Sequence, residues 1–77
     1  MKRETAEITT ESIQLDQFIK WIGITETGGQ ARFLVDEGTI LVNGVRVTER
    51  RKKLFPGDCV VIEGTEYLVK QADEPGL

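Results

Sequence analysis

The sequence predicts a single small domain of the α+β class. Between residues 15 and 35, apolar side chains recur at the spacing of a helix. After Gly38 the pattern becomes rich in β-branched residues, and four short apolar runs are separated by glycine-containing turns. Helices followed by strands are typical of an α+β domain, and 77 residues suffice for one domain spanning residues 1–77.

A short first strand is predicted at about residues 6–10, where Thr, Ile and Glu are mixed. A helix follows. One face of it carries the apolar residues at positions i, i+3, i+4 and i+7: Leu15, Phe18, Ile19 and Ile22. We expect Gly23 to end this helix, because glycine adopts the left-handed backbone at no steric cost.

A second helix is predicted at about residues 27–37, with the hydroxyl of Thr25 or Thr27 as its cap and Gly38 at its end. Its core stripe would consist of Ala31, Leu34 and Val35. Phe33 falls almost opposite that stripe. Either this helix buries both of its sides, or Phe33 covers part of the sheet.

The second half of the chain predicts a series of strands. Asn43-Gly44 is a strong hairpin signal between apolar runs at 39–42 and 45–47. A Pro-Gly-Asp turn at 56–58 leads into a strand at 59–62, and a further turn leads into a last strand at about 66–70. We expect Asn43 and Asp58 to fix their turns, and Cys59 to be a small core residue.

Several classes of function are disfavoured by what the sequence lacks. It has no histidine, which is the commonest general base and the commonest zinc ligand. Its single cysteine excludes an internal disulfide and an all-cysteine metal site. We therefore expect no enzyme, no metal and no cofactor. No stretch approaches the roughly 20 apolar residues of a membrane span, and residues 1–5 do not resemble a signal peptide. Residence in the cytoplasm is expected.

Charge is distributed unevenly along the chain. The net charge is −3, yet residues 20–53 hold seven basic and four acidic groups and are therefore net positive. Clustered cations bind nucleic acid by releasing counterions from the phosphates. The densest cluster is the basic run, which we define as residues 50–53. The alternative interpretation is a solvated loop between two strands.

Three other side chains are candidates for RNA contact, and two of them, Arg32 and Trp21, also have a structural interpretation. Arg32 could contact RNA or pair with Asp36 one helical turn later. Lys20 points away from the core face of the first helix. Trp21 could stack on an unpaired base or could close the edge of the core.

Five short segments, by their order and spacing along the chain, resemble the S-four RNA-binding domain. Together they cover about residues 13–63. The segments are Leu15-Asp16-Gln17-Phe18-Ile19-Lys20, Thr27 with Ala31-Arg32-Phe33-Leu34, Glu37-Gly38, Val42-Asn43-Gly44 and Pro56-Gly57-Asp58. The chain looks most like the short stand-alone bacterial members, the YaaA and YbcJ-like proteins.

The resemblance implies two helices packed against a small, bent, antiparallel sheet. It also implies that RNA lies across the exposed face of the second helix and the basic strand-loop. Many members have a cation at the positions of Gln14 and Gly28, so the basic run would carry more of the phosphate contact here. The predicted RNA-binding residues are Lys20, Thr27, Gln30, Arg32, Arg46, Arg50, Arg51, Lys52 and Lys53.

The functional hypothesis is a monomeric binder of structured ribosomal or transfer RNA, which would recognise shape and phosphates. The ribosome or a protein could be a further partner. The alternative hypothesis is a small protein-interaction adaptor, in which the apolar surface around Trp21 and Phe33 docks a partner and most RNA affinity has been lost.

Overall fold

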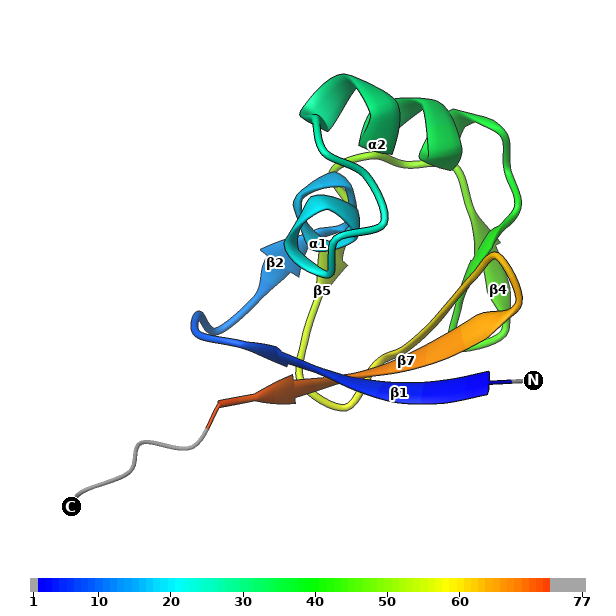
Figure 1. The fold of residues 1–77 in the computed structure, drawn as a ribbon. Coiled ribbons are helices and arrows are strands. Elements are labelled where there is room, and N and C mark those ends of the chain that lie inside the picture. The colour runs from blue at the N-terminus through cyan, green and yellow to red at the C-terminus, as the bar shows by residue number, and fades with distance from the viewer. Residues whose placement is uncertain (1, 73–77) are drawn as a thin grey trace, which may run out of the picture.

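A computed structural model of the protein describes residues 2–72, and the α+β class is confirmed (Figure 1). The helices are α1 (Leu15–Trp21) and α2 (Gly28–Asp36), and the strands are β1 (Lys2–Ile8), β2 (Ile13–Gln14), β3 (Ile40–Val42), β4 (Val45–Val47), β5 (Lys53–Leu54), β6 (Cys59–Ile62) and β7 (Thr65–Gln71). No helix in this part of the chain has the length and apolar character needed to cross a membrane.

The main sheet has five strands in the order β1-β7-β6-β3-β4. Neighbouring strands are antiparallel except at one edge, where β1 runs parallel to β7 with Lys2 opposite Thr65 and Ile8 opposite Gln71. The sheet is therefore mixed, and the expectation of a purely antiparallel sheet was wrong at β1. Strand β1 also begins four residues before the predicted segment of 6–10 and ends at Ile8.

A separate two-stranded ladder, β2 with β5, was not predicted. Ile13 pairs with Leu54, and Gln14 pairs with Lys53. The ladder immediately precedes α1 in the chain, and it joins the N-terminal end of that helix to the end of the basic run. A pair of strands only two residues long leaves too weak a pattern to be recognised in the sequence.

Both helices end as their glycines predict. At the end of α1, the Gly23 N–H donates to the Lys20 carbonyl at 3.1 Å, and the Ile24 N–H donates to the Ile19 carbonyl at 3.2 Å. These two bonds define a Schellman motif, which requires the left-handed backbone that Gly23 adopts at φ 83°. Gly38 follows α2 with φ 73°.

The cap and the core stripe of α2 are largely as predicted, but Phe33 is not. Thr27 is the cap, and Ala31 and Val35 are fully buried while Leu34 is half-buried. Phe33 is 65% exposed, so neither predicted role holds: α2 is not sandwiched, and Phe33 does not cover the sheet. Figure 1 shows why, because α2 lies on the outside of α1 and no other element of residues 2–72 covers its outer side.

The core lies between the helices and the concave side of the sheet (Figure 1). Phe18 is the largest fully buried side chain, and its ring meets the Tyr67 ring edge-on with centroids 6.3 Å apart. The buried hydrophobic residues come from nearly every element: Ala6, Ile8, Leu15, Phe18, Ile19, Ala31, Val35, Ile40, Val42, Val47, Leu54, Val60, Ile62 and Val69. Cys59 was expected among them but is only half-buried.

Asn43 and Asp58 join two turns, as well as fixing their own. Asp58 Oδ2 accepts the Phe55 N–H at 2.8 Å, and Asp58 Oδ1 accepts the Asn43 side-chain amide at 3.1 Å. Asn43 Oδ1 in turn accepts the Cys59 N–H at 2.9 Å. Their predicted structural roles are therefore observed. We refer to these three bonds as the Asn43–Asp58 network.

Candidate nucleic-acid interface

The basic run crosses the N-terminal end of α1 and is fixed there by its own backbone. The Leu15 N–H donates to the Lys52 carbonyl at 2.8 Å, and the Asp16 N–H donates to the Arg50 carbonyl at 3.1 Å. The first N–H groups of a helix have no partner within the helix. Carbonyls of the basic run supply two such partners, so the run caps α1 while its side chains remain outside.

A side-chain ion pair joins the same run to the other helix. Arg50 Nε lies 3.2 Å from Asp36 Oδ1 at the end of α2, and both side chains are about half exposed. The Arg32–Asp36 pair considered from the sequence is not formed in residues 2–72, because Asp36 pairs with Arg50 instead. In Figure 1 the segment between β4 and β5 passes along α2 before it reaches β5.

Two further cations flank this arrangement. Arg46 lies in β4 opposite Leu41, and its Cδ comes within 3.9 Å of the position that a Cβ would occupy on Gly38, just after α2. Lys53 lies in β5 opposite Gln14. The cations of residues 46–53 therefore extend from the C-terminal end of α2 to the N-terminal end of α1.

All nine predicted RNA-binding residues are exposed. Among residues 2–72, the two ion pairs are Arg3–Glu66 and Arg50–Asp36. The other predicted cations therefore have no carboxylate partner in this part of the chain: Lys20, Arg32, Arg46, Arg51, Lys52 and Lys53. Their charge is available to a phosphate backbone without breaking an ion pair.

Thr27 caps α2, as predicted, and Gln30 has a structural role at the same cap that was not predicted. Thr27 Oγ1 accepts the Gln30 N–H at 3.2 Å, and the Gln30 carboxamide oxygen accepts the Glu26 N–H at 3.2 Å. This reciprocal arrangement resembles a capping box, whose sequence signal is a hydroxyl residue followed three positions later by Glu or Gln. Both residues lie at the start of α2, whereas Arg50 contacts its end. RNA contact by either one stays a prediction.

Lys20 lies on α1 one turn after Asp16, whose N–H bonds the basic run. Residues four apart share a helix face. Lys20 therefore shares a face of α1 with Asp16 but lies in the last turn of the helix, whereas the basic run contacts the first turn. Arg32 lies on α2 and is separated by one turn from Asp36, the partner of Arg50.

Two exposed apolar side chains next to the lysines were missed in the sequence. Phe55 is 50% exposed and Val45 is 65% exposed, and both line a shallow hollow of about 390 Å³ together with Lys52 and Lys53. Asn43 and Asp58 line the same hollow, so the Asn43–Asp58 network forms part of its wall. The available signal was an aromatic residue two positions after the basic run and directly before a turn.

In the described residues, no cluster of three or more acidic or cysteine side chains could hold a metal ion.

Comparison with known proteins gives consistent matches. The model of the S4 domain family matches residues 6–70. A probable ribosome maturation protein, RlbA of Bacillus subtilis (strain 168), is 42% identical over 57 residues, which are 74% of this chain and 80% of that protein. The small ribosomal subunit protein uS4 of Rhodopirellula baltica is 38% identical over 55 residues, which are 71% of this chain but 27% of that protein.

A solved structure shares the fold. The 30S ribosomal protein S4e from Thermoplasma acidophilum superposes with a TM-score of 0.66 over 78% of this chain and 32% of that one, at 21% sequence identity. This chain thus spans most of the length of RlbA, and about a third or less of either ribosomal protein.

Proposed function

Because this chain belongs to the S4 domain family, we propose that it binds structured RNA through the basic run, Arg46 and the outer face of α2. The observation that carries the proposal is the attachment of the basic run to both helices, by two backbone bonds to α1 and the Arg50–Asp36 pair to α2. Cations held on a fixed backbone present a defined pattern of charge, which suits an RNA of defined shape.

Phosphate contact is the proposed chemistry. Arginine offers a planar fork that fits two phosphate oxygens, and lysine adds a mobile point charge. Ribosomal RNA is the proposed target, because the relative that matches over most of both chains is named a probable ribosome maturation protein. The proposed role is one of binding without catalysis, by a monomer, where ribosomes are found.

The proposal is tested by a salt series. Binding of ribosomal RNA fragments is measured by gel shift between about 50 and 200 mM salt, and each phosphate contact contributes roughly 0.7–0.9 to the slope of log K against log salt. In the Arg51→Ala/Lys52→Ala/Lys53→Ala variant, we expect weaker binding and a slope shallower by about 2 to 3. Arg50 is left intact, because its removal would also leave the Asp36 carboxylate without its ion-pair partner.

A charge-matched control separates local contact from net charge. The Lys2→Ala/Arg3→Ala/Lys70→Ala variant also removes three cations, but from β1 and β7. We expect it to keep nearly the wild-type slope. The proposal fails if wild type shows no salt-dependent RNA binding, or if the control variant loses as much affinity as the basic-run variant.

A second candidate function is the protein-interaction adaptor, favoured by the exposure of Phe33 at 65%. In a monomer this aromatic ring has no partner among the described residues. A purified protein partner whose binding survives nuclease treatment and is lost in Phe33→Ala would favour that function over RNA binding.

A further inference from the structure

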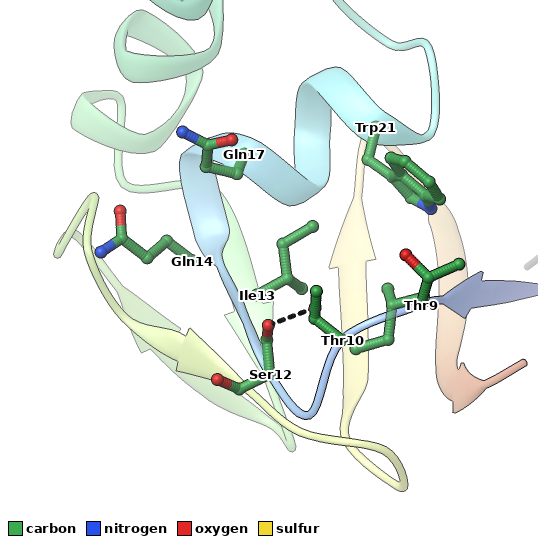
Figure 2. A pocket seen from close by; sticks show the side chains of 8 residues that line it. Thr9, Thr10, Ser12, Ile13, Gln14, Gln17 and Trp21 are labelled. Carbon is green, nitrogen blue, oxygen red and sulfur yellow. Dashed lines mark hydrogen bonds between the residues drawn. The ribbon is translucent and has the colours of Figure 1, made fainter.

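A hollow of about 430 Å³ lies between α1 and the segment that joins β1 to β2, and strand β2 also lines it. In Figure 2, Trp21 and Gln17 project from α1, Thr9 lies next to the indole ring, and Ile13 lies between the helix and the joining segment. The joining segment is held in a tight turn, because Thr10 Oγ1 donates to the Ser12 carbonyl at 2.7 Å. The volume is within the range of small-molecule sites.

Trp21 forms one wall of the hollow in a fixed orientation. Its Nε1 donates to the Glu7 carbonyl at 2.7 Å, which ties the end of α1 to β1. The side chain is nevertheless 55% exposed. The polar atom of the indole is therefore satisfied by the protein, while much of its apolar ring remains uncovered. Such a ring is a surface on which a planar group can stack.

The remaining side chains of the hollow are neutral. Hydroxyls come from the joining segment, and carboxamides come from Gln14 and Gln17, but no charged residue among residues 2–72 lines it. A phosphate would find no cation there. A carboxamide both donates and accepts hydrogen bonds, which matches the edge of a nucleobase. A stacking ring with neutral donors and acceptors suits an uncharged heterocycle.

The hollow adjoins the basic run. Gln14 lines it and is paired in the β2–β5 ladder with Lys53, and the next residue, Leu15, bonds the Lys52 carbonyl. Paired residues of neighbouring antiparallel strands lie about 5 Å apart. An RNA strand whose phosphates contact Lys52 and Lys53 therefore has the hollow within one nucleotide's reach.

We propose that this hollow receives one unpaired nucleobase of the bound RNA, stacked on Trp21 and contacted at its edge by Gln17. The inference rests on the proposed RNA-binding function and adds to it a preference for RNA with an unpaired base, such as a bulge or a loop. Fully paired RNA keeps its bases stacked and has none to insert.

The test uses Trp21 itself as the probe, because it is the single tryptophan of the chain. The full chain is titrated with a synthetic RNA hairpin that contains one bulged adenine, and with the same hairpin in which the bulged nucleotide is abasic. The two RNAs share their phosphates and differ in one base. We expect the adenine hairpin to quench Trp21 emission and to bind about tenfold more tightly, as is usual for one stacked base.

Variants distinguish stacking from structural damage. Trp21→Ala should bind both hairpins equally, whereas Trp21→Phe, which also loses the bond to Glu7, should keep most of the preference for adenine. Leu68→Ala removes an exposed apolar side chain of β7, outside both the hollow and the proposed interface, and should keep all of it. If Trp21→Phe loses the preference as fully as Trp21→Ala, the bond to Glu7 and not stacking is responsible, and the inference is overturned.

Failure of the inference is separable from failure of the proposed function. If both hairpins bind wild type equally, with salt dependence and without a change in Trp21 emission, the base site is refuted and RNA binding stands. If neither the hairpins nor ribosomal RNA fragments bind, both proposals fall together.

Discussion

Asn43 contributes to the β3–β4 hairpin through its backbone conformation and through its side-chain hydrogen bonds. Replacing it with glycine or alanine separates the two contributions. Asn43 has a backbone φ of 52°, which is a left-handed conformation that residues with a Cβ rarely adopt. Its side chain also makes two bonds of the Asn43–Asp58 network, one to Asp58 and one from the Cys59 N–H. Asn43→Gly removes only the bonds, because glycine accepts the conformation. Asn43→Ala removes the bonds and adds backbone strain.

The expected magnitudes follow from these contacts. Two net hydrogen bonds at a partly exposed site contribute about 1–2 kcal/mol, which is the destabilisation expected for Asn43→Gly. The left-handed conformation costs a residue with a Cβ about 1 kcal/mol more, so Asn43→Ala should lose about 2–3 kcal/mol. Domains of this size have a total stability of about 4–12 kcal/mol. The alanine variant should therefore be markedly less stable but still folded.

Urea unfolding followed by Trp21 emission and by circular dichroism measures both changes. In thermal unfolding, the melting temperature should fall by about 4–8 °C for each kcal/mol of lost stability. A double-mutant cycle with Asp58→Ala isolates the shared bond, for which we expect a coupling of about 0.5–1.5 kcal/mol. Equal stability of the glycine and alanine variants would refute the predicted backbone strain in Asn43→Ala. A coupling near zero would refute a stabilising bond between Asn43 and Asp58.

Three other variants test the described contacts. Asp36→Asn should strengthen RNA binding by about two- to fivefold at low salt, because it removes a negative charge beside the cations, while the two backbone bonds to α1 still hold the basic run; gel shifts at low and high salt check this. Thr27→Ala should cost about 1 kcal/mol of stability by removing the cap at the Gln30 N–H; an additional loss of RNA affinity in fully folded protein would show direct contact. Phe33→Lys should change the unfolding free energy by no more than about 0.5 kcal/mol, since the ring is exposed; a larger loss in urea unfolding would contradict the exposed position.

Local signals in the sequence predicted most of the elements. Gly23 and Gly38 end their helices with a left-handed backbone, and Asn43-Gly44 makes the β3–β4 hairpin. Each signal depends on the conformational preference of one or two residues, so it needs no knowledge of the tertiary structure. For the same reason Asn43 and Asp58 could be identified as turn residues in advance.

Features that depend on distant partners could not be predicted in this way. The parallel pairing of β1 with β7 is set by contacts between opposite ends of the described chain, and β1 itself buries only Ala6 and Ile8. The exposure of Phe33 depends on which element covers α2, and periodicity does not report this. A predominantly polar edge strand offers little apolar pattern to detect, and an uncovered aromatic ring departs from the tendency of aromatic side chains to be buried.

The candidate site also combines features that local signals predicted with features that depend on tertiary contacts. The cations were located from the charge pattern alone, but their attachment to α1 and α2 required the three-dimensional contacts of Arg50 and Lys52. The hollow beside Trp21 is lined only by residues between Ile8 and Trp21, but its shape depends on how the joining segment folds back against α1, which no local pattern indicates. The sequence offered Trp21 as a stacking residue or a core-edge residue; it is exposed and tied to β1.

The pairing of β1 with β7 also sets the order in which the domain can assemble during synthesis. Among the described elements, β1 is translated before all others, yet its partner strand, Thr65–Gln71, is translated after all others. The helices and the β3–β4 hairpin involve shorter loops and can form earlier, because closing long loops is slower. The Trp21–Glu7 bond needs β1 in place and is therefore made at the end. A nascent chain that lacks β7 should leave its indole untethered, so tryptophan emission would report the moment at which the fold closes.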